Sequence, residues 1–220
     1  MWFWLLRWVL LGPVVRWFTR PRVVGLDRFP SAGPVVVAAN HRAEIDSLVL
    51  SLVLPRQPRF LAKAEYYAGA GLRGRTERWL CSVTGQIPVD RAGGSAASAS
   101  LAAAETLLRS GGVWAIYPEG TRSPDGRLHR GHTGVVRVAR AVPDAVVLPV
   151  GLLGTEVVDP PSRGGGGRRW WRRGRVTVVI GAPVDVRNGE VRAATDALMR
   201  AIGELTDQRP LDRYVPRRAA

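Results

Sequence analysis

The sequence predicts an α/β fold with a mixed, mainly parallel central sheet flanked by helices, and three observations support this prediction. Short apolar runs of strand length, such as Val35–Ala39, alternate along the chain with longer segments of helical pattern. A length of 220 residues suits one domain with a substantial core. The hydrophobic content of 46% is ordinary for a globular protein. Strands and helices are therefore expected to succeed one another within one folded domain.

The predicted elements follow one another in a regular order. Strands are expected at residues 22–24, 34–39, 59–62, 86–89, 113–117, 146–150 and 175–180. Helices are expected at residues 46–54, 64–81, 95–109, 134–141 and 191–205. The helix at 95–109 is rich in alanine and leucine and is followed by Gly111-Gly112, a common helix stop. Such alternation is typical of parallel sheets, in which ligands bind beyond the carboxyl ends of the strands.

The N-terminal segment, residues 1–18, is rich in tryptophan and leucine, and Gly12-Pro13 and several arginines interrupt it. A membrane-spanning helix needs roughly 20 uninterrupted apolar residues, and a secretory signal needs a cleavage site of small residues. The segment has neither pattern. We therefore interpret residues 1–20 as a helical segment lying in the membrane interface, and residues 21–220 as the folded domain. The alternative is a first helix packed on the core of that domain.

The charge of the chain is strongly positive, with 32 Lys and Arg against 18 Asp and Glu and a net charge of +14. This excess predicts an anionic partner, either nucleic acid or a phospholipid surface. Eight tryptophans favour the membrane surface. Among them, Trp170-Trp171 lie in the basic, glycine-rich segment 162–175, which we interpret as a further membrane contact rather than a solvated loop. The only cysteine, Cys81, excludes an intramolecular disulfide and suits a core position in a reducing compartment.

A histidine and an aspartate frame the turn after the strand at 34–39. His41 follows the strand, and Asp46 comes five residues later at the start of the next helix. A carboxylate can accept the N–H of one ring nitrogen and leave the other nitrogen free to take a proton. The pair therefore predicts a general base.

Polar residues also follow two other predicted strands. Asp90-Arg91 come after the strand at 86–89, and Glu119, Gly120 and Arg122 come after the strand at 113–117. The planar guanidinium of an arginine matches the geometry of a phosphate. Each turn taken alone is also compatible with an ordinary surface salt bridge. Because the carboxyl ends of parallel strands meet at one edge, we expect the three turns to converge there.

These segments occur in the order and rough spacing of the motifs of the glycerolipid acyltransferases. They are Asn40-His41-x-x-x-x-Asp46, Gly85-x-Ile87-x-Val89-Asp90-Arg91, Tyr117-Pro118-Glu119-Gly120-Thr121-Arg122-Ser123 and Val147-Leu148-Pro149-Val150. From about Val24 to the last helix, the chain resembles the bacterial 1-acyl-sn-glycerol-3-phosphate acyltransferases, the PlsC-like group. The strand that ends in Lys63, the only lysine of the chain, also resembles the family pattern.

The resemblance implies roles for individual residues. His41 would be the base that takes the proton of the acceptor hydroxyl, and Asp46 would orient and polarise it. The hydroxyl oxygen would attack the acyl thioester directly, without an acyl-enzyme. Substrate-binding roles are implied for Lys63, Arg91, Glu119, Gly120, Thr121 and Arg122. The chain departs from the family pattern at Tyr117, where phenylalanine is common, and at 128–131, where the family often has an aromatic and a basic residue.

The implied function is transfer of a fatty acyl group to the hydroxyl of a lysophospholipid, above all 1-acyl-sn-glycerol 3-phosphate, which gives phosphatidic acid for phospholipid biosynthesis. Acyl-CoA or an acyl carrier protein thioester would be the co-substrate. The expected location is the cytoplasmic face of a bacterial cell membrane, with peripheral or monotopic attachment. The alternatives are another lysolipid or glycerol 3-phosphate as the acceptor, or a non-catalytic, basic membrane-binding protein.

Other ligands and chemistries are not expected. His129 and His132 have a His-x-x-His spacing, but Gly131 lies between them and no cysteine joins them, so we predict no metal and no cofactor. The chain has no Gly-x-Ser-x-Gly motif and no Walker-type phosphate loop. No helix-turn-helix or RNA-binding signature is recognisable, so nucleic acid is not an expected partner.

Overall fold

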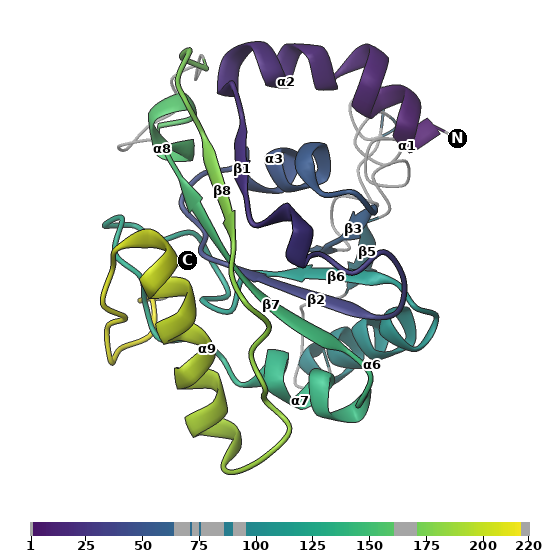
Figure 1. Cartoon of the computed structure of the whole chain (residues 1–220), viewed down its shortest axis with the longest axis vertical. Coiled ribbons are helices and arrows are strands. Elements are labelled where there is room, and N and C mark those ends of the chain that lie inside the picture. Colours follow the sequence, from purple (N-terminus) through teal and green to yellow (C-terminus); the bar gives the residue numbers. More distant parts are fainter. Residues whose placement is uncertain are drawn as a thin grey trace.

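The fold is a central sheet covered by helices on both faces (Figure 1). The structure is a computed structural model and describes residues 2–63, 71, 75, 86–89, 96–160 and 171–216. The central sheet has the strand order β1-β8-β7-β2-β6-β3. These strands are β1 (Arg22–Val24), β2 (Val35–Ala39), β3 (Pro58–Arg59), β6 (Val113–Ile116), β7 (Val146–Leu153) and β8 (Thr177–Ile180).

Neighbouring strands of the central sheet are parallel except β7 and β8, which are antiparallel. The predicted mixed, mainly parallel sheet is therefore confirmed. The longer helices are α2 (Gly12–Thr19), α3 (Asp46–Val53), α6 (Ala96–Arg109), α7 (Gly134–Ala141) and α9 (Val191–Thr206). Shorter helical elements are α1 (Trp2–Leu5), the π-helical turn η1 (Leu6–Leu10), the 3-10 turn η2 (Leu26–Arg28) and α8 (Thr155–Val158).

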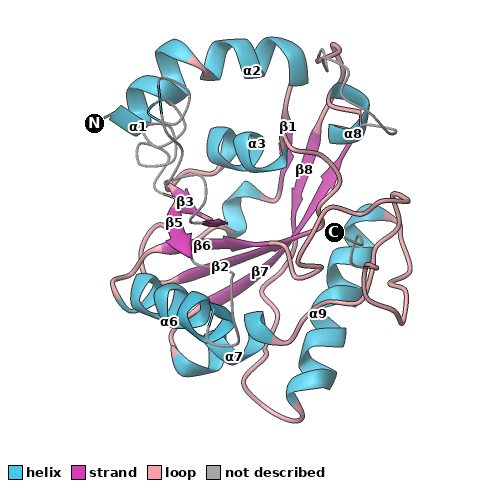
Figure 2. Ribbon diagram, turned by 180° about the vertical axis from the view of Figure 1, so that it is seen from behind, coloured by secondary structure: helices cyan, strands magenta, loops and turns pink. Residues whose placement is uncertain are grey.

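Strand β2 separates two apolar layers. All five of its residues are buried, and because successive side chains point to opposite faces, each face receives its own set. Val35, Val37 and Ala39 pack in the layer under α3, whereas Val36 and Ala38 pack in the layer under α6, α7 and α9. Figure 2 shows these two groups of helices on opposite sides of the sheet. A strand buried on both faces explains the unbroken apolar run in the sequence.

The segment expected as one strand at 59–62 is two strands in two sheets, and this is a correction. β3 pairs with the edge of the central sheet, whereas β4 (Leu61–Lys63) pairs with β5 (Ile87–Val89) in a separate two-stranded sheet. Phe60 lies between β3 and β4, and its carbonyl accepts the N–H of Ile87 at 2.9 Å. The strand predicted at 86–89 is thus outside the central sheet. The helix predicted at 64–81, including Cys81, lies outside the described residues.

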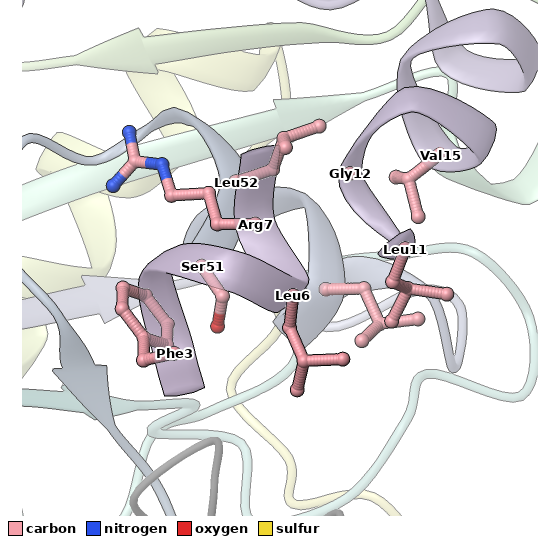
Figure 3. A pocket seen from close by; sticks show the side chains of 9 residues that line it. Phe3, Leu6, Arg7, Leu11, Gly12, Val15, Ser51 and Leu52 are labelled. Atoms are coloured by element: carbon pink, nitrogen blue, oxygen red, sulfur yellow. The ribbon is translucent and has the colours of Figure 1, made fainter. Parts of the chain in front are cut away.

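The N-terminal segment is helical and docks on α3 with one face. Phe3, Leu6 and Val15 are buried there, beside an apolar groove (Figure 3). Arg7 anchors the segment because its guanidinium donates to the carbonyl of Leu54 at 2.6 Å. The predicted alternative, a helix packed on the core, therefore holds for this face.

The opposite face of the same segment is apolar and exposed. Its exposed residues are Trp4, Leu5, Trp8, Val9, Leu10, Val14 and Trp17. At the end of the segment, Phe18 packs edge-on against Trp171 with ring centroids 5.7 Å apart. Trp170 lies outside the described residues. Among the helices that the structure describes, none combines the length and the apolar character needed to cross a membrane.

Candidate active site

Two of the three predicted turns meet at the carboxyl ends of β2 and β6. These strands are parallel neighbours, paired from Val35 with Val113 to Ala38 with Ile116. The turns that follow them are joined directly, because the N–H of Ser123 donates to the carbonyl of His41 at 2.8 Å. The convergence inferred from the sequence is therefore present for the His41 turn and the 117–123 turn.

The imidazole of His41 is held by a buried carboxylate. His41 Nδ1 lies 2.7 Å from Asp46 Oδ2, and Asp46 is fully buried at the start of α3. The same oxygen accepts the backbone N–H groups of Arg42 and Ala43 at 2.7 and 2.9 Å. Asp46 thus fixes both the ring and the loop before it. Within the described part of the chain, His41 Nε2 makes no hydrogen bond, and the side chain is 17% exposed.

Tyr117 covers the imidazole. The rings of His41 and Tyr117 are stacked, with centroids 3.9 Å apart and planes inclined by 10°. The Tyr117 hydroxyl is hydrogen-bonded to Ser47 Oγ at 2.9 Å. Burial, together with the nearby charge of Asp46, raises the pKa of Tyr117 well above 10, so the phenol is uncharged near neutral pH. The ring is therefore an apolar face against His41.

Glu119 is buried and binds the backbone of two segments. Oε1 accepts the N–H of His41 at 3.1 Å, and Oε2 accepts the N–H of His129 at 2.9 Å. Burial raises the pKa of Glu119 to about 7, although these two hydrogen bonds act in the opposite direction. With an exposed fraction of 2%, Glu119 organises the site from beneath. Its implied contact with the substrate stays a prediction.

Gly120 and Thr121 form the exposed bend of the same turn. Gly120 has a φ of +78°, and an added Cβ would lie 3.0 Å from the His132 ring. A glycine is required here because other residues are strained at positive φ. The N–H of His132 donates to the carbonyl of Pro118 at 2.7 Å, which brings the 129–132 segment alongside. Thr121 is exposed on the outside of the bend.

Arg122 reaches back toward the His41 loop. Its guanidinium lies 2.5 Å from Glu44, and the side chains are 42% and 62% exposed. Of the predicted phosphate-binding cations, Arg122 is the one whose side chain the structure describes. Lys63 ends β4, but only its backbone is described, and Arg91 lies outside the described residues. Their roles stay predictions.

Two residues with no role assigned from the sequence, Asn40 and Asp159, support the His41 loop. Asn40 donates from its amide nitrogen to the carbonyl of Leu152 at 3.0 Å and accepts the N–H of the same residue at 2.7 Å. Asp159 accepts the N–H of Ile45 at 3.1 Å. These contacts tie both ends of the His41 loop to the β7–α8 region. In the sequence, the sign of such a role was a polar residue, Asn40, directly after an apolar strand.

The other two histidines have partners of their own. His129 is 1% exposed, and its Nε2 lies 2.9 Å from Asp125. The pKa of Asp125 falls to about 2: burial opposes this, but hydrogen bonds led by His129 outweigh it. His132 stacks on Tyr214 with centroids 4.7 Å apart. Across the described residues, no cluster of three or more His, Cys, Asp or Glu side chains could hold a metal ion.

Comparison with known proteins gives concordant results. A family model described as acyltransferase matches residues 20–153. The chain is 31% identical over 176 residues to the chloroplastic 1-acyl-sn-glycerol-3-phosphate acyltransferase LPAT1 of Arabidopsis thaliana, covering 79% of this chain and 46% of that protein. It is 37% identical over 128 residues to 1-acyl-sn-glycerol-3-phosphate acyltransferase alpha of Homo sapiens, covering 56% and 42% respectively. The chain therefore spans less than half the length of these relatives.

A solved structure has the same fold. The crystal structure of the 1-acyl-sn-glycerophosphate (LPA) acyltransferase PlsC from Thermotoga maritima superposes with a TM-score of 0.65 and 24% sequence identity. The superposition covers 90% of this chain and 80% of that one. Since the family model also matches more than half of the sequence, the chain belongs to the acyltransferase family.

Proposed function

We propose that the protein transfers a fatty acyl group from an acyl thioester to the free hydroxyl of 1-acyl-sn-glycerol 3-phosphate and so forms phosphatidic acid. The observation that carries the proposal is the His41–Asp46 pair, 2.7 Å apart, beside an arginine-bearing turn at the edge of the sheet. The names of the relatives support the same acceptor.

The reaction follows from the geometry of the imidazole. With Nδ1 held by Asp46, Nε2 of His41 takes the proton of the acceptor hydroxyl while the hydroxyl oxygen attacks the thioester carbonyl. A C–O bond forms, the C–S bond breaks, and the proton passes to the departing thiolate. General-base assistance of this kind contributes about 10²- to 10⁴-fold in rate. The thioester supplies the activated acyl group, so the proposed reaction requires no metal or cofactor.

The acceptor phosphate is proposed to bind at Arg122, with Lys63 and Arg91 completing the seat. Arg122 already donates to one carboxylate oxygen of Glu44, and an oxygen of a phosphate can accept from the same guanidinium. In this proposal the phosphate replaces Glu44 as the partner of Arg122. The bound phosphate then holds the acceptor hydroxyl at a fixed distance from His41. Because binding has already brought the reacting groups together, the entropic part of the activation barrier is lower.

The proposed location is a membrane surface, contacted by the exposed apolar face of the N-terminal segment. Trp8 is 53% exposed, with the guanidinium of Arg16 4.3 Å from its ring centroid. Trp17 is 54% exposed, with Arg173 4.4 Å away. Tryptophan beside arginine suits the boundary between headgroup phosphates and acyl chains. Peripheral or monotopic attachment at the cytoplasmic face of a bacterial membrane belongs to the same proposal.

The decisive experiment supplies purified protein with lysophosphatidate and either acyl-CoA or acyl carrier protein thioesters, and follows thiol release together with phosphatidate formation. The wild type should turn over, and His41→Ala should lose activity by at least about 10²-fold. Asp125→Asn is the matched control, because it alters a second His–carboxylate pair away from Nε2 of His41. Equal turnover by His41→Ala and the wild type would refute the proposal.

Two alternatives are outcomes of the same experiment. Faster acylation of glycerol 3-phosphate or another lysolipid would assign a different acceptor to the same site. Liposome binding without thiol release from any thioester would indicate a non-catalytic membrane-binding protein.

A further inference from the structure

Three aromatic rings connect the core to the proposed base. The His41 imidazole lies on Tyr117, and Tyr117 also stacks with Phe60, with centroids 5.9 Å apart and planes inclined by 22°. Phe60 is 7% exposed and belongs to the apolar layer under α3. The plane of the imidazole is therefore set by a side chain that is itself packed into the core.

The hydroxyl of Tyr117 adds a second constraint. It is bonded at 2.9 Å to Ser47, the residue that directly follows Asp46 in the first turn of α3. The orientation of the Tyr117 ring is thus tied to the same turn that holds Nδ1 of His41. A phenylalanine at position 117 would provide the stack but not this bond.

We propose that Tyr117 and Ser47 form a positioning pair for His41. This proposal rests on the proposed function, in which His41 is the general base. Asp46 fixes one edge of the imidazole, and Tyr117 fixes its plane. Nε2 then faces the acceptor hydroxyl without the ring having to rotate into place. A ring held in the reactive orientation favours efficient proton transfer. Because the hydroxyl of Tyr117 is bonded to Ser47, the pair acts through His41 and takes no proton itself.

Kinetics separate the stack from the hydrogen bond. Tyr117→Leu removes both, so kcat should fall about tenfold to a hundredfold, while KM for lysophosphatidate and for the thioester stays within about twofold. Tyr117→Phe and Ser47→Ala each remove only the bond, and kcat should fall roughly threefold in either. The double variant, Ser47→Ala with Tyr117→Phe, should be no slower than the slower single variant, because both changes remove the same interaction.

Phe60→Leu is the matched control. Leucine keeps an apolar side chain in the core behind Tyr117 and leaves the His41–Tyr117 stack and the bond to Ser47 in place. Some loss of thermal stability is expected, with kcat within about twofold of the wild type. If Phe60→Leu lowered kcat as much as Tyr117→Leu did, a general disturbance of the core would explain the effect and the proposal would fail.

A spectroscopic readout does not depend on turnover. In protein labelled with carbon-13 in its three histidines, the His41 ring protons lie over the Tyr117 face and are shielded by it. His41→Gln identifies their signals. Tyr117→Leu should move these signals downfield, whereas Tyr117→Phe should leave them near their wild-type positions.

The outcomes distinguish the two proposals. Unchanged kcat in Tyr117→Leu, a change confined to KM, or unmoved His41 ring signals would overturn the positioning pair while leaving the acyl transfer intact. A wild-type protein that acylates no acceptor from any thioester would refute the proposed function, and the ring signals would still decide whether Tyr117 stacks on His41 in solution.

Discussion

The carboxylate of Glu119 accepts a hydrogen bond from the backbone N–H of His41 at 3.1 Å, so an acid from the turn after β6 holds the turn after β2. Its other oxygen binds the N–H of His129 at 2.9 Å. Three segments therefore meet at one buried side chain. Glu119 therefore binds the protein backbone with both of its oxygens, whereas Gly120, Thr121 and Arg122 of the same turn are exposed.

The buried position of Glu119 predicts a pH dependence of stability. Burial raises its pKa from 4.5 to about 7, so between these values the folded state keeps a proton that the unfolded state has released. The free energy of unfolding should therefore fall as the pH rises through this window, by about 3 kcal/mol from this residue.

Glu119→Gln should remove this dependence because glutamine does not ionise. From pH 4.5 to pH 8, the free energy of unfolding of the wild type should fall by about 3 kcal/mol relative to that of the variant. Urea denaturation at several pH values measures both free energies. Glu105→Gln, which replaces a more exposed acid on α6, is the control and should run parallel to the wild type. Parallel curves for Glu119→Gln as well would contradict the prediction.

Gly120→Ala should impair both folding and activity. At a φ of +78° an alanine is strained by about 1–2 kcal/mol, and its Cβ would also press on His132 at 3.0 Å. Gly33→Ala is the matched control, since Gly33 has a φ of +80° but no atoms near the added Cβ. Both variants should have a lower melting temperature than the wild type, and only Gly120→Ala should also lose catalytic activity. Equal activity of the two would show that the bend tolerates displacement.

The parts of this site that the sequence predicted correctly depend on local or nearest-neighbour relations. His41 and Asp46 lie five residues apart across one strand–helix turn, so their meeting needs no distant partner. The 117–123 turn comes beside them because β2 and β6 are adjacent and parallel. Although β3, β4 and β5 come between β2 and β6 in the chain, the carboxyl ends of parallel strands lie at the same edge of a sheet, so the two turns were expected together.

The parts that the sequence did not predict depend on long-range contacts. The burial of Glu119 and its bond to the N–H of His129 depend on the folding back of the 129–132 segment, and periodicity carries no sign of that contact. The strand at 86–89 was placed by its sequence in the alternation of strands and helices, yet its partner is β4, outside the central sheet. β7 continues to Leu153 because Asn40 and the antiparallel β8 bind its extra residues.

Because Glu44 pairs with Arg122, we expect Glu44 to compete with the acceptor phosphate for the Arg122 guanidinium. An exposed pair of this kind contributes about 0.2–1 kcal/mol, so Glu44→Gln should lower KM for lysophosphatidate by up to about fivefold. Arg122→Ala should raise the same KM by about tenfold or more, because a charge-assisted hydrogen bond is lost. Glu105→Gln breaks the comparable Arg109 pair on α6 and should leave KM unchanged. A higher KM in Glu44→Gln would show that Glu44 assists binding instead.

The exposed side chain of Trp8 should contribute measurably to the affinity of the protein for a membrane. About half of this large side chain is exposed, and burying about 100 Å² in lipid stabilises binding by about 2 kcal/mol. Trp8→Ser should therefore weaken partitioning onto anionic liposomes roughly thirtyfold in flotation assays. Tyr214→Ser is the control, because Tyr214 is an aromatic residue of similar exposure in the C-terminal segment. Equal losses in the two variants would locate the membrane contact elsewhere.

Asp46→Asn should leave the fold in place and remove most of the activity. The carboxylate oxygen that meets His41 Nδ1 also accepts the N–H groups of Arg42 and Ala43. An asparagine oxygen that keeps those backbone bonds stays in the same place and still accepts the N–H of Nδ1, but it carries no charge. The imidazolium that forms when Nε2 takes the proton of the acceptor hydroxyl is then no longer stabilised by a carboxylate.

The expected fall in kcat for Asp46→Asn is about 10²- to 10⁴-fold, with a melting temperature within a few degrees of the wild type. Asp125→Asn makes the same chemical change beside His129, whose buried ring has its Nε2 2.9 Å from the carboxylate of Asp125. That variant should keep kcat within about threefold of the wild type, because His129 has no role in proton transfer. If the two asparagine variants lost activity equally, the charge of Asp46 beside His41 would not be what the reaction requires.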